Sequence, residues 1–157
     1  MERILDDGSF CKAVRELEPT AFAVAWLLLR NNADCEDAMS AAVLRAYEKR
    51  SGLKNADSFR AWFLRILKNE AYNVLRHRSR LVPLETLASE AASQAPDPVL
   101  AEALLKLPEQ QRIAVVLQAK GYSQSEIAHI LRIPEGTVKS RLSRAKASLQ
   151  SELKGEE

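Results

Sequence analysis

Basic and hydroxyl side chains follow one another closely in the segment EGTVKSRLSRAK, which covers residues 135–146. Lysine and arginine pair with phosphates or donate to base edges, and serine hydroxyls can hydrogen-bond to either. If the segment is a helix, Val138 and Leu142 lie on its opposite, inward face. The side chains left to contact a nucleic acid are Lys139, Ser140, Arg141, Ser143, Arg144 and Lys146. The pattern therefore predicts a helix that reads a DNA groove.

A second, shorter helix is expected directly before this one. Ser123 and Glu126 form the Ser-x-x-Glu pattern of a capping box, and a tight turn is expected from Arg132 to Pro134. Ala128 and Val138 supply the small and the β-branched residue that two closely crossing helices need. Arg132 stands where many such turns carry glycine. The pattern favours a helix-turn-helix, and the alternative is a plain helical hairpin with a charged face.

Positive charge is concentrated in two separate segments, although the formal net charge is only +2. Residues 59–80 hold six basic residues against Glu70, and residues 132–146 hold five against Glu135. Each segment alone could be an ordinary solvated helix face. Two such segments, one in each half of a near-neutral chain, indicate two contacts with a polyanion.

The residue combinations that catalysis requires do not occur in this sequence. It has no pattern of paired carboxylates, nucleophile and base, metal cluster or phosphate loop, and His77 and His129 stand alone. Cys11 and Cys35 form no metal motif and are expected to be reduced thiols. The longest apolar run, residues 21–29, is far shorter than the roughly 20 residues of a membrane span. We expect a cytoplasmic, non-enzymatic protein without cofactor, metal or membrane insertion.

Helical periodicity accounts for nearly the whole chain. Residues 10–30 predict a buried helix pair broken near Pro19, and residues 32–50 predict a helix with acids in its first turn. Residues 59–75 place apolar side chains at steps of three and four. Residues 81–97 lose this period and are expected to be a flexible linker, after which Asp97-Pro98 restarts a helix. The expected fold is all-α, with small domains at 1–80 and 98–157 and the linker at 81–97.

The motifs also resemble a known family. Residues 107–149, from LPEQQR to RAKASL, resemble region 4 of bacterial RNA polymerase sigma factors in the extracytoplasmic-function (ECF) group of the sigma-70 family. The stretches NADCEDAMSAAVLRAYEK and SFRAWFLRILKNEAYNVLRHRSR are similar to region 2 of the same group. The resemblance covers about residues 10–152. It implies core RNA polymerase, promoter DNA and an anti-sigma factor as partners.

Three surfaces follow from the resemblance. It implies that core polymerase is bound by Asp34, Glu36, Asp37, Leu44 and Arg45. It implies that the −10 promoter element faces Lys68, Asn69, Asn73, Arg76 and Arg78, with Phe59 and Trp62 behind a loop that holds unstacked bases. The simpler interpretation of these two aromatic residues, which their apolar side chains favour, is that they belong to the core. The six residues named for 135–146 match positions that face the −35 element.

The chain departs from the family pattern at three positions in these segments. Ser40 and Ala41 stand where the family usually has Gln-Glu, and Asn73 replaces a usual Asp. Two other hypotheses therefore stay open beside a working sigma factor. One is a sigma-like decoy that binds an anti-sigma factor, and the other is an independent helix-turn-helix regulator.

Overall fold

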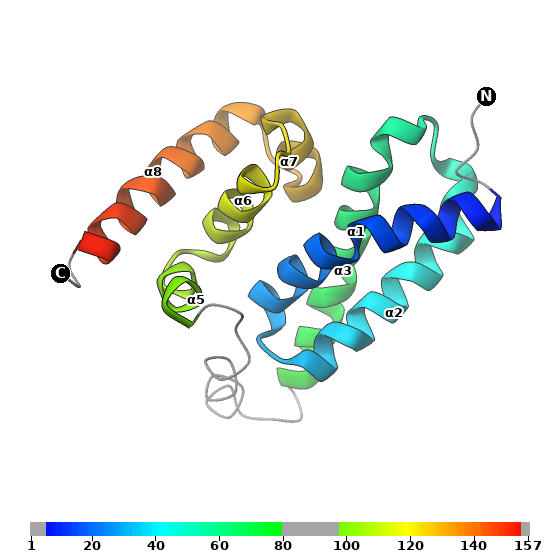
Figure 1. Cartoon of the computed structure of the whole chain (residues 1–157), viewed down its shortest axis with the longest axis horizontal. Helices are drawn as coiled ribbons and strands as arrows, with labels where there is room; N and C mark the ends of the chain where they lie inside the picture. The colour runs from blue at the N-terminus through cyan, green and yellow to red at the C-terminus, as the bar shows by residue number, and fades with distance from the viewer. Residues whose placement is uncertain (1–5, 80–97, 155–157) are drawn as a thin grey trace.

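The computed structural model describes residues 6–79 and 98–154, and every regular element in these two ranges is a helix (Figure 1). This confirms the predicted all-α class. The elements are α1 (Asp7–Leu29), α2 (Asn32–Lys49), the 3₁₀ turns η1 (Arg50–Gly52) and η2 (Ala56–Ser58), α3 (Phe59–Ser79), α5 (Pro98–Leu105), α6 (Glu109–Ala119), α7 (Gln124–Leu131) and α8 (Glu135–Lys154). The expected linker, residues 81–97, lies outside the described residues. No described helix is both long and apolar enough to cross a membrane.

Helices α1, α2 and α3 pack against one another, and we call them the N-terminal bundle. Ala38, Ala42 and Ala46 of α2 recur every fourth residue and are fully buried, so this face lets neighbouring helices approach closely. Phe63 and Leu67 of α3 fill the space opposite and are also fully buried. The predicted apolar stripe of residues 59–75 is therefore the core face of α3.

Helix α1 differs from its prediction, because it runs unbroken through Pro19. A proline inside a helix removes one backbone hydrogen bond and crowds the preceding turn. Pro19 is exposed, whereas the following residues Val24 to Leu29 are all buried. We attribute the continuity to the burial of this C-terminal half, which offsets the single lost bond.

Helices α5 to α8 form a second unit, the C-terminal bundle. The capping box at the start of α7 is confirmed, since Ser123 and Glu126 bond each other's backbone N–H groups at 3.1 and 3.0 Å. Ala128 and Val138 are both buried where α7 meets α8. The predicted helix-turn-helix is thus present, with α7 as its first helix and α8 as its second.

The two bundles lie against each other. Helix α7 contacts α3, and α6 contacts α1, so the first helix of the helix-turn-helix rests on the basic helix of the N-terminal bundle (Figure 1). The sequence pattern does not indicate this contact, because the residues that form it are far apart in the chain and each bundle is amphipathic by itself.

Candidate nucleic-acid interface

Helix α8 presents a continuous polar face to solvent. Its inward side chains Val138, Leu142 and Ala145 are buried against the C-terminal bundle. The exposed residues of the predicted groove-reading set are Lys139, Ser140, Ser143, Arg144 and Lys146. Three of these are cations on one side of a helix, which is the arrangement that a DNA major groove accepts.

Arg141 is placed differently from the rest of that set. Its guanidinium donates to the Gln110 side-chain carbonyl of α6, and its side chain is half-buried. The residue therefore helps to hold α8 against α6 rather than standing free on the outer face. Sequence alone could not show this, because Arg141 lies beside Leu142 on the border between the two faces.

The turn between α7 and α8 contains an unusual backbone conformation. Arg132 closes α7 with a left-handed φ of 58°, a region that favours glycine. A side chain in this region costs about 1 kcal/mol or slightly more. The absence of glycine, noted from the sequence, is therefore accommodated by strain and not by a different turn.

Replacing Arg132 by Gly should therefore stabilise the protein by about 1 kcal/mol, which raises the melting temperature by roughly 3 °C in a chain of this size. Arg132→Ala is the matched control, since alanine removes the same side chain but keeps the left-handed cost. Thermal unfolding followed by circular dichroism measures both. Equal stabilisation by Gly and Ala would show that the backbone is not the cause.

Helix α3 carries the second candidate reading face. Asn69, Asn73 and Arg76 are exposed and follow one another at steps of four and three, so they lie on one side of the helix. Arg76 donates to the Asn73 side-chain carbonyl. Two amides and a guanidinium can hydrogen-bond to bases and phosphates alike.

Lys68, predicted to belong to this face, is only 7% exposed. Burial lowers the pKa of its ammonium group, and the nearby Arg132 and Arg65 lower it further. Arg132 belongs to the C-terminal bundle, so the bundle contact places like charges close together. No ion pair of Lys68 with a carboxylate is present in the part of the chain that the structure describes.

Asp34 and Arg78 were predicted for two different surfaces, and the structure brings them together. Arg78 donates to the Asp34 carboxylate at 2.9 Å, with side-chain exposures of 26% and 8%. The pair joins the start of α2 to the end of α3. Both charges are thus engaged within the N-terminal bundle.

The aromatic pair Phe59 and Trp62 is divided between two environments. Phe59 is buried among Phe10, Phe63 and Trp62, with ring centroids 5.8 to 6.0 Å apart. Trp62 is half-buried and lines a hollow of about 510 Å³. Its other walls are residues 52–55, 57, 58 and 61, with Ser125, Glu126 and His129 of α7. The resemblance implied a loop in front of this aromatic pair but not which residues form it, because loop residues have no helical periodicity.

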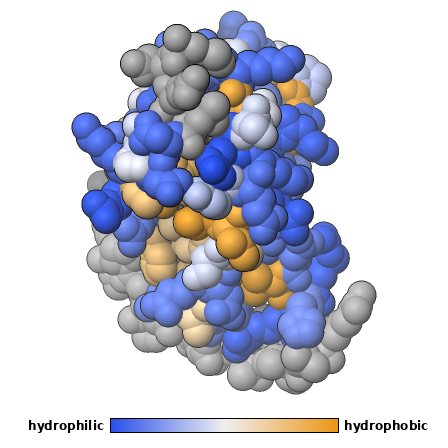
Figure 2. Space-filling view, turned by 90° about the vertical axis from the view of Figure 1, so that its right-hand side faces the viewer, coloured by the Kyte–Doolittle hydropathy of each residue, from blue (hydrophilic) through white to orange (hydrophobic). Residues whose placement is uncertain are grey.

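The outer face of α2 is acidic with an apolar centre. Glu36, Asp37 and Ser40 are exposed, and Leu44 is the one exposed large hydrophobic residue in the described chain, at 61%. Arg45 pairs with Glu70 at 2.7 Å and stays half-exposed. On the side shown in Figure 2, the N-terminal bundle gathers hydrophobic residues in the middle of a hydrophilic surround.

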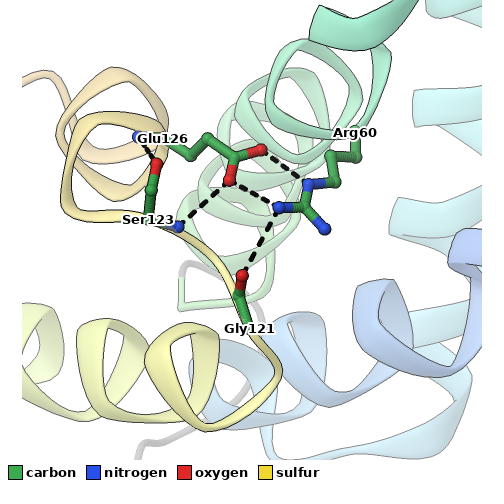
Figure 3. Close-up of polar contacts among 4 residues, drawn as sticks. All are labelled: Arg60, Gly121, Ser123 and Glu126. Atoms are coloured by element: carbon green, nitrogen blue, oxygen red, sulfur yellow. Dashed lines mark hydrogen bonds and ion pairs between the residues drawn. The ribbon is translucent and has the colours of Figure 1, made fainter.

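An ion pair that the sequence did not indicate joins the two bundles. Arg60 of α3 donates to both carboxylate oxygens of Glu126 of α7, at 2.6 and 2.5 Å (Figure 3). The hydrogen bond from Arg60 lowers the pKa of Glu126 below its ordinary value of 4.5. Burial, with Arg65 and Arg132, lowers the pKa of His129 below 6.5.

These two shifts predict that acid destabilises the protein in two steps. Unfolded His129 takes up its proton first, so stability falls as pH drops below about 6.5 until the native histidine is protonated too. The Glu126 contribution is fully present above 4.5 and is lost as pH falls through its lowered native pKa. Melting temperatures across this pH range test both steps: His129→Gln should flatten the upper one and Glu126→Gln the lower one. Unchanged profiles in both variants would contradict the assignment.

Metal-ligating side chains are not clustered in the part of the chain that the structure describes. No group of three or more His, Cys, Asp or Glu residues that could hold a metal ion occurs within residues 6–79 and 98–154. The surfaces described above can form hydrogen bonds, ion pairs and stacking contacts with a polyanion.

Comparison with known proteins matches two segments of the chain to known families. Residues 13–81 match the family described as sigma-70 region 2, and residues 99–149 match sigma-70 region 4. The chain is 34% identical over 150 residues to the ECF RNA polymerase sigma factor SigM of Mycobacterium tuberculosis, covering 92% of this chain and 76% of SigM.

Two solved structures share the fold. The sigma factor RpoE in complex with the anti-sigma factor NepR from Bartonella quintana has a TM-score of 0.78 and 29% identity, over 92% of this chain and 96% of that one. CnrH in complex with the cytosolic domain of CnrY has a TM-score of 0.73 and 25% identity, over 97% and 92%. With both sigma regions matched in order, the chain belongs to the ECF group of the sigma-70 family of RNA polymerase sigma factors.

Proposed function

We propose that this sigma factor binds core RNA polymerase through α2 and directs it to promoters by reading two DNA elements with α3 and α8. The observation that carries the proposal is the exposed face of α8, where Lys139, Arg144 and Lys146 project from a helix whose opposite side is fully packed. Such a helix can enter a major groove without unfolding any part of its bundle. We assign it to the −35 element.

Helix α3 and the hollow beside it suit the other element. Asn69, Asn73 and Arg76 offer donors and acceptors to a strand that is already separated. The hollow at Trp62 has an aromatic wall, and stacking of a base on an aromatic side chain contributes about 1–3 kcal/mol. We therefore assign strand capture at the −10 element to α3 and loop 52–58.

Binding to the polymerase is assigned to the outer face of α2. Asp37, Ser40 and Leu44 are exposed there at steps of three and four. An exposed leucine bordered by carboxylates fits a partner surface with an apolar pocket and basic rim. Ser40, which replaces a polar residue usual in the family, favours the decoy as the second candidate function.

Control by an anti-sigma factor is part of the proposal. RpoE of Bartonella quintana and CnrH, both similar to this chain over most of its length, were solved bound to NepR and to the cytosolic domain of CnrY. The similarity supports a partner of the same kind for this chain.

In vitro transcription separates the candidate functions. Core RNA polymerase is mixed with the full chain and a promoter library, and transcripts are sequenced. A working sigma factor yields transcripts that share two upstream elements, and the Lys139→Ala/Arg144→Ala double variant loses the upstream preference. Failure of the chain to bind core polymerase in a pull-down, with retained binding to an anti-sigma factor, would establish the decoy instead.

A further inference from the structure

The contact between the bundles is built around one carboxylate. Glu126 accepts from Arg60 through both oxygens and also accepts from the Ser123 backbone N–H at 3.0 Å (Figure 3). Arg60 in turn lies over the Tyr122 ring, 4.2 Å from its centroid. The capping box therefore fixes the Glu126 side chain before the bundles dock. Little side-chain freedom is then lost when the ion pair with Arg60 forms.

A second polar contact lies farther along α3. The Tyr72 hydroxyl donates to the Glu109 carboxylate of α6 at 2.5 Å. Tyr72 and Arg60 are about 18 Å apart along the helix, at 1.5 Å per residue. The C-terminal bundle is therefore held against α3 at two separate points. Glu126 of α7 is the acceptor at one point and Glu109 of α6 is the acceptor at the other.

Between these two contacts the bundles repel each other. Arg65 and Lys68 of α3 face Arg132 of the C-terminal bundle, with His129 beside them. Burial lowers the pKa of Arg65, Lys68 and His129, and the charge of Arg132 lowers each of them further. Arg65, His129 and Arg132 line a hollow of about 540 Å³. No ion pair with a carboxylate is formed by these four side chains within the described residues. A phosphate chain would neutralise the same cations.

We infer that in the free chain the C-terminal bundle docks on α3 and competes with promoter DNA for this helix, with the Arg60–Glu126 pair as its latch. The inference rests on the proposed role of α3 at the −10 element. Docking covers Lys68, so DNA gains this cation only after the bundles separate. The balance of two attractive contacts against the three like charges of Arg65, Lys68 and Arg132 makes separation accessible to a polyanionic ligand.

Distance measurement by pulsed electron paramagnetic resonance tests the docking in the full chain. One spin label is attached to Cys11, which is exposed, and the other to an introduced Ser148→Cys on α8. Cys35 stays unlabelled, because burial raises the pKa of its thiol to about 12. The variants are Arg60→Gln, Glu126→Gln and both together. Glutamine at 126 can keep the capping box while removing the charge.

Wild-type protein should give one narrow distance, and each single variant should raise the ratio of open to docked molecules on the order of tenfold. The double variant should open no further than the single ones, because each removes the same pair. Lys106→Gln breaks an ion pair inside the C-terminal bundle, Lys106–Glu152, and should leave the distance unchanged. A broad wild-type distribution, or a distribution unaffected by Arg60→Gln, would overturn the inference.

Tyr72→Phe provides a second test that does not depend on correct folding of the Arg60 variant. It removes only the hydroxyl that reaches Glu109 and should open the bundles less than Arg60→Gln does. Circular dichroism confirms that each variant is folded. The inference would also be overturned if the bundles stayed closed both in Tyr72→Phe and in the folded Arg60 variants.

Competition with DNA is tested with a fluorescent, mixed-sequence single-stranded oligonucleotide. Arg60→Gln should bind it several-fold more tightly than wild type, because the apparent affinity scales with the open fraction. Adding Lys68→Gln should remove part of that gain. If the bundles open without a change in oligonucleotide affinity, the competition is refuted. If the wild-type chain with core polymerase initiates no transcription, the proposed function is refuted. The distances between the two spin labels would still show whether the bundles are docked.

Discussion

Replacing Leu44 by Gln should weaken binding to core RNA polymerase by about 30-fold or more, the range expected for an apolar anchor at the centre of an interface. Leu44 is the exposed large hydrophobic side chain of the described chain, and it lies in the C-terminal half of α2. Water covers it in the free protein, and a partner pocket would remove that water. Pull-down or fluorescence titration with core polymerase measures the loss.

Folding should hardly change in this variant. Leu44 is 61% exposed, so little buried area is lost, and glutamine has nearly the helix propensity of leucine. Equal melting temperatures together with weakened binding would identify a binding residue. If Leu44→Gln bound core polymerase with wild-type affinity, the polymerase contact could not be on this face, and the decoy would be favoured.

Charge on the same face offers a matched pair of variants. Asp37→Lys reverses a carboxylate seven residues before Leu44, and Glu18→Lys reverses an exposed one on α1. The first should reduce polymerase binding more strongly at low salt than at high salt, and the second should not. Neither should alter stability by more than a few tenths of a kcal/mol.

Features that depend on neighbours in the chain were predictable from the sequence. The Ser123–Glu126 capping box, the buried face of α3 and the outward face of α8 all follow from spacings of three and four residues, which helix geometry fixes. The sequence also indicated the division into two helical parts. These local rules hold because each of them concerns atoms within one or two helical turns.

Features that depend on distant residues were not predictable in this way. Pro19 is tolerated because the residues after it are buried by other helices, and Lys68 is covered because α7 packs on α3. Asp34 meets Arg78 across 44 positions, and Arg60 meets Glu126 across 66. The positions of basic residues in the sequence reveal two basic segments. They do not reveal which of these cations form ion pairs or hydrogen bonds within the protein.

This distinction affects how the DNA-facing residues should be ranked. Arg78 and Arg141 carry charge but are held by Asp34 and Gln110. Lys68 becomes available only if the bundles separate. Among the cations predicted to face DNA, Lys139, Arg144 and Lys146 of α8 are exposed. The clearest test of DNA reading therefore concerns that helix.

Lys139→Ala and Arg144→Ala should each cost about 1–3 kcal/mol of discrimination between a matched −35 element and one altered at a single base pair. Both side chains are exposed on α8, and the residues beneath them, Val138 and Leu142, are buried and fix the helix in place. A cation held at a base edge favours one base over another, whereas a cation at a phosphate favours none.

Lys146 provides the control, since it is exposed on the same helix but points in a different direction around the helix axis from Arg144. Lys146→Ala should weaken binding to every sequence alike and reduce the slope of log affinity against log salt by about one. Titrations of the three variants with matched and altered duplexes, at several salt concentrations, separate the two kinds of contact. Specificity that survives in Lys139→Ala and Arg144→Ala would mean that α8 only clamps phosphates, and the bases would then have to be read elsewhere.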